Sequence, residues 1–131
     1  MKTVLSAPVE DYLKAIYEIE QTAGGASVAT TDLAQRLGVA PASVTGMVRR
    51  LAEQGWLEHE RYRGVRLTGA GQRVALRTLR RHRVIETYLT QALGLPRDRV
   101  HDEAERLEHV ASDMLIDRMV AAIEATGGGL A

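Results

Sequence analysis

The sequence predicts a mainly α-helical protein in which a winged helix-turn-helix is followed by an all-helical part. Three observations carry this prediction: apolar residues recur at helical spacing along most of the chain, a short turn separates two of the helical segments, and two strand-like segments follow them. At 131 residues the chain is long enough for one compact domain or two small units. We place the boundary so that residues 1–72 form the first part and residues 73–131 the second.

The first two elements are predicted to be an amphipathic helix and a short helix. Apolar residues in Val9–Gln21 follow helical spacing, and the next such segment is Thr31–Leu37. Thr30 or Thr31 is the expected N-cap of the short helix, and Gly38 stands where a glycine commonly ends one.

The third element completes a helix-turn-helix. The turn that begins at Gly38 leads to Pro41, which suits the first position of a helix because a proline has no N–H to leave unpaired there. We expect this helix over Pro41–Gln54, followed by Gly55. Its predicted core residues are Val44, Met47, Val48 and Leu51.

A hairpin and three helices are expected after the helix-turn-helix. Trp56–Glu60 and Val65–Thr68 read as short strands, which would form the wing. Gly69 and Gly71 then precede a long helix that runs to about Leu93. The last two predicted helices open at Asp98 or His101 and at Ser112-Asp113, and the first of them runs to about Ala111.

The net charge of zero conceals a basic middle. Residues 47–83 carry ten Lys and Arg against three Asp and Glu, whereas residues 84–131 carry four against nine. A concentrated basic segment is typical of a surface that binds a polyanion, and it favours DNA over protein as the partner of a winged helix. The alternative is that these charges form solvated helix faces.

The helix that begins at Pro41 is the expected DNA-reading helix, because a helix in the major groove reads bases with its N-terminal residues. Arginines further along suit phosphates, and arginines of the hairpin could contact an adjacent backbone or a minor groove. The predicted DNA-binding residues are Pro41, Ala42, Ser43, Thr45, Gly46, Arg49, Arg50, Arg61, Arg63 and Arg66.

Side chains that bind metals gather on two of the later helices. Glu105, Glu108 and His109 stand at i, i+3 and i+4, so on a helix they share one face. Carboxylates gathered in this way repel one another unless a cation lies between them, and the pattern therefore predicts a metal site rather than a merely polar face. The six candidates are His82, Glu86, His101, Glu105, Glu108 and His109.

The donor types narrow the chemistry. Nitrogen and oxygen donors without thiolate suit Mn²⁺, Fe²⁺, Co²⁺, Ni²⁺ or Zn²⁺. A di-iron enzyme needs Glu-x-x-His on each of two helices, and neither the Glu105–His109 segment nor the His82–Glu86 segment has that spacing. We expect no enzyme and no small organic substrate. The remaining alternative is a winged-helix regulator that senses a non-metal ligand.

Five segments between Pro8 and Glu124 carry a resemblance to a known family. They are Glu10-Asp11-Tyr12-Leu13, Ala42-Ser43-Val44-Thr45-Gly46-Met47-Val48, Tyr62-Arg63-Gly64, Arg81-His82-Arg83 and His101-Asp102-Glu103-Ala104-Glu105-Arg106-Leu107-Glu108-His109. With these segments the chain resembles the diphtheria-toxin-repressor family of metal-dependent transcriptional regulators, and within it the manganese-responsive branch.

The resemblance implies two neighbouring metal sites, with Mn²⁺ or Fe²⁺ as the cofactor. Iron-responsive members have Met in place of Asp11 and Cys in place of Glu105, so oxygen donors at these positions favour Mn²⁺. Lys14 stands where the manganese branch usually has a second carboxylate, and an ammonium group cannot bind a metal. The implied sites are Asp11, Glu105, Glu108 and His109 for one ion, and His82, Glu86 and His101 for the other.

The resemblance also implies how such a protein works. It would be a homodimeric repressor of metal-homeostasis genes that binds a palindromic double-stranded DNA operator, with metal fixing the first helix to the helical metal-binding and dimerisation domain. The expected dimer contact lies on the last two helices and includes Leu107, Val110, Leu115 and Met119.

Composition bears on the cellular setting. The chain has no cysteine, which excludes disulfides, and no apolar run approaches the roughly 18 residues of a membrane span. The segment Met1–Ser6 is too short for the apolar region of a signal peptide. We therefore expect a cytoplasmic protein with no membrane partner.

Overall fold

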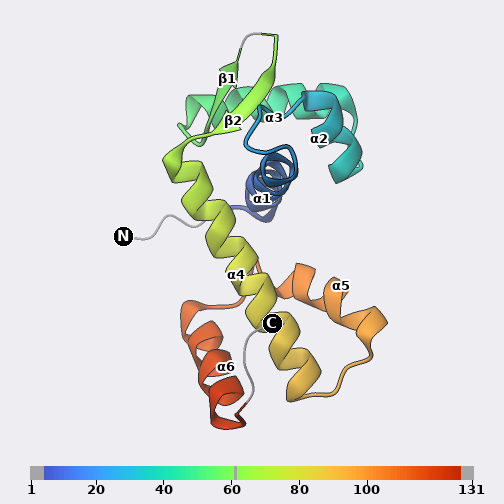
Figure 1. The fold of residues 1–131 in the computed structure, drawn as a ribbon, viewed down its shortest axis with the longest axis vertical. Helices are drawn as coiled ribbons and strands as arrows, with labels where there is room; N and C mark the ends of the chain where they lie inside the picture. The colour runs from blue at the N-terminus through green and yellow to red at the C-terminus, as the bar shows by residue number, and fades with distance from the viewer. Residues whose placement is uncertain (1–4, 61, 128–131) are drawn as a thin grey trace. The chain divides into compact units, whose positions relative to one another are not determined.

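The computed structural model describes residues 5–60 and 62–127, which fold as two units, each with its own hydrophobic core (Figure 1). The first unit is Met1–Leu76 and the second is Arg77–Ala131. The helix α4 (Gly69–Gln91) begins in the first unit and continues in the second. The prediction that Gly69 and Gly71 precede this helix was wrong, because both lie in its first turn, and it ends two residues before the predicted Leu93. The mainly helical fold class is confirmed, while the domain boundary at residues 72 and 73 stays a prediction.

Three helices make up most of the first unit: α1 (Ala7–Thr22), α2 (Thr30–Leu37) and α3 (Pro41–Glu53). The Ser6 hydroxyl caps α1 by accepting a hydrogen bond from the backbone N–H of Val9 at 3.4 Å. The fully buried side chains that hold the three helices together are Leu13, Ile16, Leu33, Val44, Val48 and Leu51. The predicted core face of the third helix is confirmed, with Met47 partly buried against it.

The turn between α2 and α3 forms as predicted, but the start of α2 does not. Gly38 adopts a left-handed conformation with φ of 67°, and α3 begins at Pro41. The prediction that Thr30 or Thr31 caps α2 was wrong. Thr30 is already helical, so the capping position falls on Ala29, whose extended backbone carries no side chain able to accept a hydrogen bond.

The predicted wing is an antiparallel hairpin of β1 (Leu57–Glu60) and β2 (Gly64–Leu67). Val28, in the segment before α2, adds a bridge to Val65, with backbone hydrogen bonds of 2.7 and 2.8 Å in the two directions. Three of the four strand ends differ from the predicted ones by one residue, and the end of β1 at Glu60 is as predicted. The wing is thereby joined by hydrogen bonds to the polypeptide that leads into the helix-turn-helix.

A buried carboxylate also connects α1 to the wing. Glu20 is 3% exposed, and its Oε1 accepts a hydrogen bond from the backbone N–H of Leu67 at 2.8 Å. Burial raises the pKa of Glu20, and this effect outweighs the hydrogen bond from Leu67 and the charge of Arg66, which both lower the pKa. The contact therefore carries an electrostatic cost at neutral pH.

We expect Glu20→Gln to raise the melting temperature at about pH 8 by a few degrees, because the amide oxygen keeps the hydrogen bond without burying a charge. Folding raises the pKa of Glu20, so the stability that this group contributes is fully present below its ordinary pKa and is lost as the pH rises through the raised value. The advantage of the variant should shrink as the pH falls. Thermal unfolding at about pH 8 and about pH 4 measures it, and Glu53→Gln is the exposed control. An advantage that does not change with pH would contradict this account.

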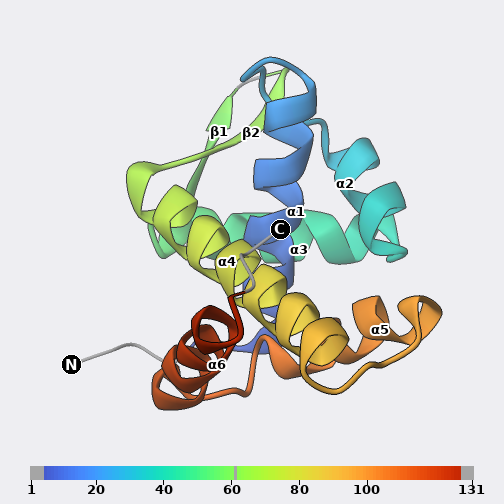
Figure 2. The same cartoon turned by 60° about the horizontal axis from the view of Figure 1, so that its bottom comes forward.

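The second unit consists of the later part of α4 with α5 (Arg97–Leu107) and α6 (Asp113–Ala125). The later part of α4 lies between α5 and α6 both in Figure 1 and in Figure 2. The buried core residues of the second unit are Val84, Ile85, Leu89, Val100, Ala104, Ala111, Ile116, Met119 and Ile123. No helix in residues 5–60 and 62–127 is long and apolar enough to cross a membrane.

The ends of α5 differ from the prediction. The helix begins at Arg97 because Pro96, with φ of −60° and ψ of 142°, is extended and takes the capping position, so Asp98 and His101 lie inside the helix. It ends at Leu107 and not near Ala111, since the chain turns there before α6. The predicted start of α6 is confirmed, with the Ser112 hydroxyl as its N-cap.

Candidate metal centre and DNA-binding face

His82 lies at the centre of a group of metal-binding side chains in the second unit, and both of its ring nitrogens face carboxylates. Its Nε2 is 3.1 Å from Oε2 of Glu86, one turn further along α4. Its Nδ1 is 2.5 Å from Oε1 of Glu108 and 3.8 Å from Oε1 of Glu105. A single imidazole thus stands between carboxylates that come from different elements.

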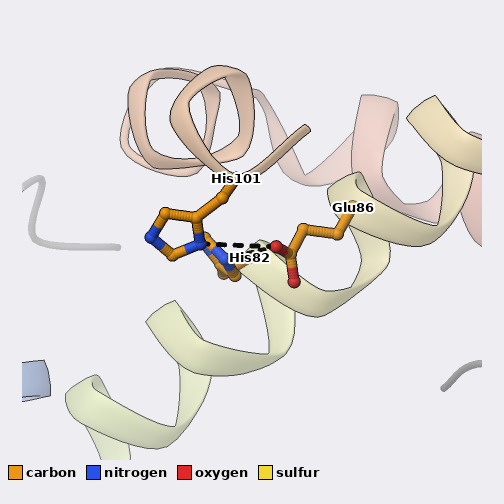
Figure 3. A group of neighbouring side chains, drawn as sticks. All are labelled: His82, Glu86 and His101. Atoms are coloured by element: carbon orange, nitrogen blue, oxygen red, sulfur yellow. Dashed lines mark ion pairs between the residues drawn. The ribbon is translucent and has the colours of Figure 1, made fainter. Parts of the chain in front are cut away.

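His101, on α5, lies beside His82 and faces the Glu86 carboxylate (Figure 3). Its Nδ1 is 3.4 Å from Oε2 of Glu86, and its Nε2 is 3.4 Å from Oε1 of Glu105. The rings of His101 and His82 meet edge to face, with centroids 4.9 Å apart. The donor atoms of His82, Glu86 and His101 lie within 4.8 Å of one another, as do those of His82, Glu105 and Glu108.

These side chains fit a divalent cation. They offer imidazole nitrogen and carboxylate oxygen with no sulfur, which is the donor set of Mn²⁺, Fe²⁺ and the later divalent metals. His109 adds a further nitrogen, with Nε2 3.7 Å from Oε2 of Glu108. We call these six residues the histidine–glutamate cluster: His82, Glu86, His101, Glu105, Glu108 and His109.

The cluster has a buried end and an open end. The side chain of Glu108 is 0% exposed, whereas those of Glu86 and His101 are 34% and 65% exposed. A cavity of about 330 Å³ opens beside Glu86 and His101, and it also includes Arg83 and Arg97. The cavity thus lies at the exposed end of the cluster, away from the buried Glu108 carboxylate.

The structure brings together all six predicted metal-binding residues of the second unit. It does not separate them as sharply as the resemblance implied, because His82, expected beside Glu86 and His101, also contacts Glu108 of the other implied site. Asp11 lies in the first unit on α1, and its metal role stays a prediction. The metal roles of the other residues stay predictions as well.

Sequence reasoning missed one residue of this region, Arg81. It is 5% exposed, and its guanidinium contacts the segment that follows α5. A signal was available, because Arg81 lies in helical phase with Ile85 and Leu89 on the buried face of α4. A charged residue within an apolar stripe indicates a specific buried partner.

The predicted reading helix presents the residues predicted to bind DNA to solvent. Along α3, Val44 and Val48 are fully buried in the first unit and Met47 is partly buried, while most of the other residues of the helix are exposed. The exposed ones include all seven predicted on this helix: Pro41, Ala42, Ser43, Thr45, Gly46, Arg49 and Arg50. A Cβ at Gly46 would meet nothing within 4 Å, so this face can approach a partner closely.

The wing arginines are less uniform. Arg63 is exposed within the hairpin turn. Arg66 points across the hairpin, with its Nε 2.8 Å from Oε1 of Glu60, so a phosphate would compete with that carboxylate. Arg61 lies outside the described residues. The DNA-binding roles of all three stay predictions.

Two family models match the chain in sequence order. The "Iron dependent repressor, N-terminal DNA binding domain" matches residues 4–65, which contain the helix-turn-helix and most of the wing. The "Iron dependent repressor, metal binding and dimerisation domain" matches residues 68–126, which contain the whole histidine–glutamate cluster. The exposed face of α3 thus falls within the DNA-binding match, and the histidine–glutamate cluster falls within the metal-binding match.

Individual relatives agree with these matches. The chain is 35% identical over 116 residues to the HTH-type transcriptional regulator MntR of Lysinibacillus sphaericus (strain C3-41), covering 88% of this chain and 81% of the relative. It is 44% identical to a solved manganese-dependent transcriptional repressor in complex with manganese, with a TM-score of 0.74 over 88% of this chain and 52% of that one. It is 33% identical to the solved manganese regulator SloR, with a TM-score of 0.77 over 88% of this chain and 53% of that one.

The chain spans about half the length of these two solved proteins and about four fifths of the curated relative. Both family models and the relatives agree with the resemblance seen in the sequence. The chain therefore belongs to the diphtheria-toxin-repressor family of metal-dependent transcriptional regulators, on its manganese-responsive branch.

Proposed function

We propose that this chain is a metal-dependent DNA-binding transcriptional repressor of metal-homeostasis genes, with Mn²⁺ as its effector and Fe²⁺ as the second choice. The observation that carries the proposal is the presence, in one chain, of the histidine–glutamate cluster and of an exposed helix-turn-helix face. A solved relative is named as a manganese-dependent repressor in complex with manganese, which supports the same choice of metal.

Mn²⁺ and Fe²⁺ suit a cluster rich in carboxylates. Raw affinity rises toward the later metals in any nitrogen and oxygen site, so selection of Mn²⁺ must come from geometry and from the metal available in the cell. Glu105 supports the manganese branch most directly, because it supplies a carboxylate oxygen where the iron-responsive members have a sulfur donor.

We assign the metal-binding roles residue by residue. Asp11, Glu105, Glu108 and His109 would hold one ion, and His82, Glu86 and His101 the other. When bound, a divalent cation supplies the positive charge that offsets the mutual repulsion of these carboxylates. Glu108 contributes from the buried end, where few water molecules compete with its oxygens.

The switch follows from where the residues stand in the sequence. Asp11 lies on α1, ahead of the helix-turn-helix, whereas the other residues of its proposed site lie after α4. A joint between Asp11 and Glu108 would fix the DNA-reading unit to the second unit. Without metal, like charges would weaken this joint, and the two reading helices of a dimer would lose the spacing of successive major grooves.

The partner proposed for α3 is a palindromic double-stranded operator. Ser43 would donate to bases or phosphates, and Thr45 would do so after releasing the Pro41 carbonyl, to which its hydroxyl donates at 3.1 Å. Ala42 and Pro41 could contact thymine methyl groups. Arg50, further along the exposed face, suits a phosphate.

A homodimer is proposed through the second unit, where large apolar side chains are exposed. Val110 is 76% exposed, Met114 70% and Leu115 42%. The prediction that Met119 belongs to this contact was wrong, because Met119 is 7% exposed and packs in the core of its own chain. Leu107 is partly buried against the same core.

We infer that the chain is not an enzyme and that it acts in the cytoplasm. The relatives are named as transcriptional regulators, and regulation by a bound metal explains the cluster without any catalytic role. A regulator that binds DNA works in the compartment that contains the DNA.

DNA selection from a random pool tests the proposed function. In the presence of Mn²⁺ we expect an inverted repeat whose half-sites are about one helical turn, roughly 10 base pairs, apart. Metal analysis of the same preparation should show stoichiometric Mn²⁺. A pool that yields no enriched sequence, or the same sequence equally well with chelator, would contradict the proposal.

A further inference from the structure

All three guanidinium nitrogens of Arg81 donate hydrogen bonds within the second unit. Its Nε donates to the backbone carbonyl of Glu108 at 2.9 Å, and its Nη2 donates to the backbone carbonyl of Ala111. Its Nη1 donates to Oδ1 of Asp113 at 3.1 Å. The side chain is 6% exposed, so these contacts are shielded from water.

Two consecutive residues of α4 therefore hold Glu108 from both ends. Arg81 binds its backbone carbonyl, and His82 contacts its carboxylate at 2.5 Å. Glu108 follows the last residue of α5, where backbone carbonyls lack partners within the helix. Arg81 supplies such a partner and fixes the turn that carries both Glu108 and His109.

We propose that Arg81 is a positioning residue of the metal centre, one that binds no metal but fixes Glu108 and His109 in the geometry that metal binding requires. The inference rests on the proposed function, because it assigns a role toward those two ligands. Groups that support metal ligands from behind typically change metal affinity by about 10–100-fold when they are removed.

The role calls for arginine. A guanidinium offers donors in a rigid planar fork, which lets Arg81 reach two carbonyls and the Asp113 carboxylate at once. A lysine ammonium is a compact donor on a flexible stem, and it can reach only part of this set. Arg81→Lys should therefore keep the positive charge and lose the positioning.

The test measures Mn²⁺ affinity by titration of the full chain, with helix content checked by circular dichroism. We expect Arg81→Lys to lower the affinity by about 10-fold or more. The matched control is Arg77→Lys on the same helix, because Arg77 shares the Asp113 carboxylate at 2.7 Å, and its contact with that carboxylate lies away from the Glu108 and Ala111 carbonyls. The control should change the affinity by less than about 2-fold.

A second background distinguishes positioning from general loosening. The background is a double variant that carries both Glu108→Ala and His109→Ala. Introducing Arg81→Lys into this background should change the remaining Mn²⁺ affinity by less than about 2-fold. An equal loss in both backgrounds, or an unchanged affinity in the otherwise wild-type chain, overturns the inference. If Arg81→Lys does not fold, Arg81→Gln takes its place, because its shorter side chain keeps an amide donor but cannot reach both carbonyls, and unchanged affinity there overturns the inference too. A wild-type chain that binds no Mn²⁺ overturns the proposed function instead.

Discussion

Glu108→Ala is expected to lower the affinity for Mn²⁺ by at least about 100-fold, since it removes a direct donor and even indirect support of a ligand is worth 10–100-fold. Glu108 is the most buried member of the cluster, and its carboxylate contacts His82 and lies near His109. The fold should survive, because Arg81 binds the backbone carbonyl of Glu108, which the substitution leaves in place.

Titration with Mn²⁺ followed by electron paramagnetic resonance of the free ion measures this loss. Glu103→Ala is the matched control: Glu103 is another glutamate of the same segment, and its carboxylate forms an exposed ion pair with Arg106. We expect the control to bind Mn²⁺ as the wild type does. Wild-type affinity in Glu108→Ala would remove Glu108 from the proposed site.

Gly64→Ala is expected to destabilise the first unit severely. Gly64 has φ of 112°, and a Cβ there would lie 2.0 Å from the backbone carbonyl oxygen of Val28. The strained backbone costs about 1–3 kcal/mol, and the forced shift of Val28 costs about as much again. Because the Val28–Val65 bridge holds the wing, we expect loss of wing structure together with a fall in melting temperature of 10 °C or more, at roughly 4–8 °C per kcal/mol.

Gly46→Ala provides the opposite expectation for the same chemical change. Gly46 lies in α3, and a Cβ there meets nothing within 4 Å. Alanine in a helix is favoured over glycine by about 0.5–1 kcal/mol, so this variant should melt slightly higher than the wild type. Thermal unfolding of both variants makes the comparison. A Gly64→Ala variant as stable as Gly46→Ala would show that the wing does not depend on its close approach to Val28.

Much of the helix-turn-helix could be predicted because local residues determine it. Gly38 permits the left-handed conformation that ends α2, and Pro41 favours the start of α3. The buried positions Val44, Val48 and Leu51 follow from helical periodicity alone. The N-cap of α2 was mispredicted because a threonine beside the cap looks the same in sequence as a threonine at the cap.

The cluster could be predicted in part. Helix geometry guarantees that His82 and Glu86 share one face, and the same holds for His101 and Glu105. That α4 and α5 bring these pairs together depends on packing between helices, which spacing does not reveal. The number of candidate donors suggested that the two helices are adjacent, and the resemblance to a family supported that step.

The end of α5 and the role of Arg81 could not be read from local patterns. Helical spacing continues past Leu107, so nothing nearby marks the turn. The turn is held by a side chain that lies 27 residues away from Glu108 in the sequence. Because arginine is usually exposed, its burial becomes evident only when the two carbonyls and the carboxylate that surround it are known.

Metal binding to the histidine–glutamate cluster is expected to strengthen DNA binding. The most direct test measures the affinity of the chain for its selected operator DNA at one fixed salt concentration, by fluorescence anisotropy, with Mn²⁺ and then with chelator. The account predicts that Mn²⁺ tightens binding by about 10–100-fold, within the usual range of allosteric coupling, and that Glu108→Ala loses this response. Equal operator affinity with Mn²⁺ and with chelator, in a preparation shown to bind Mn²⁺, would contradict it.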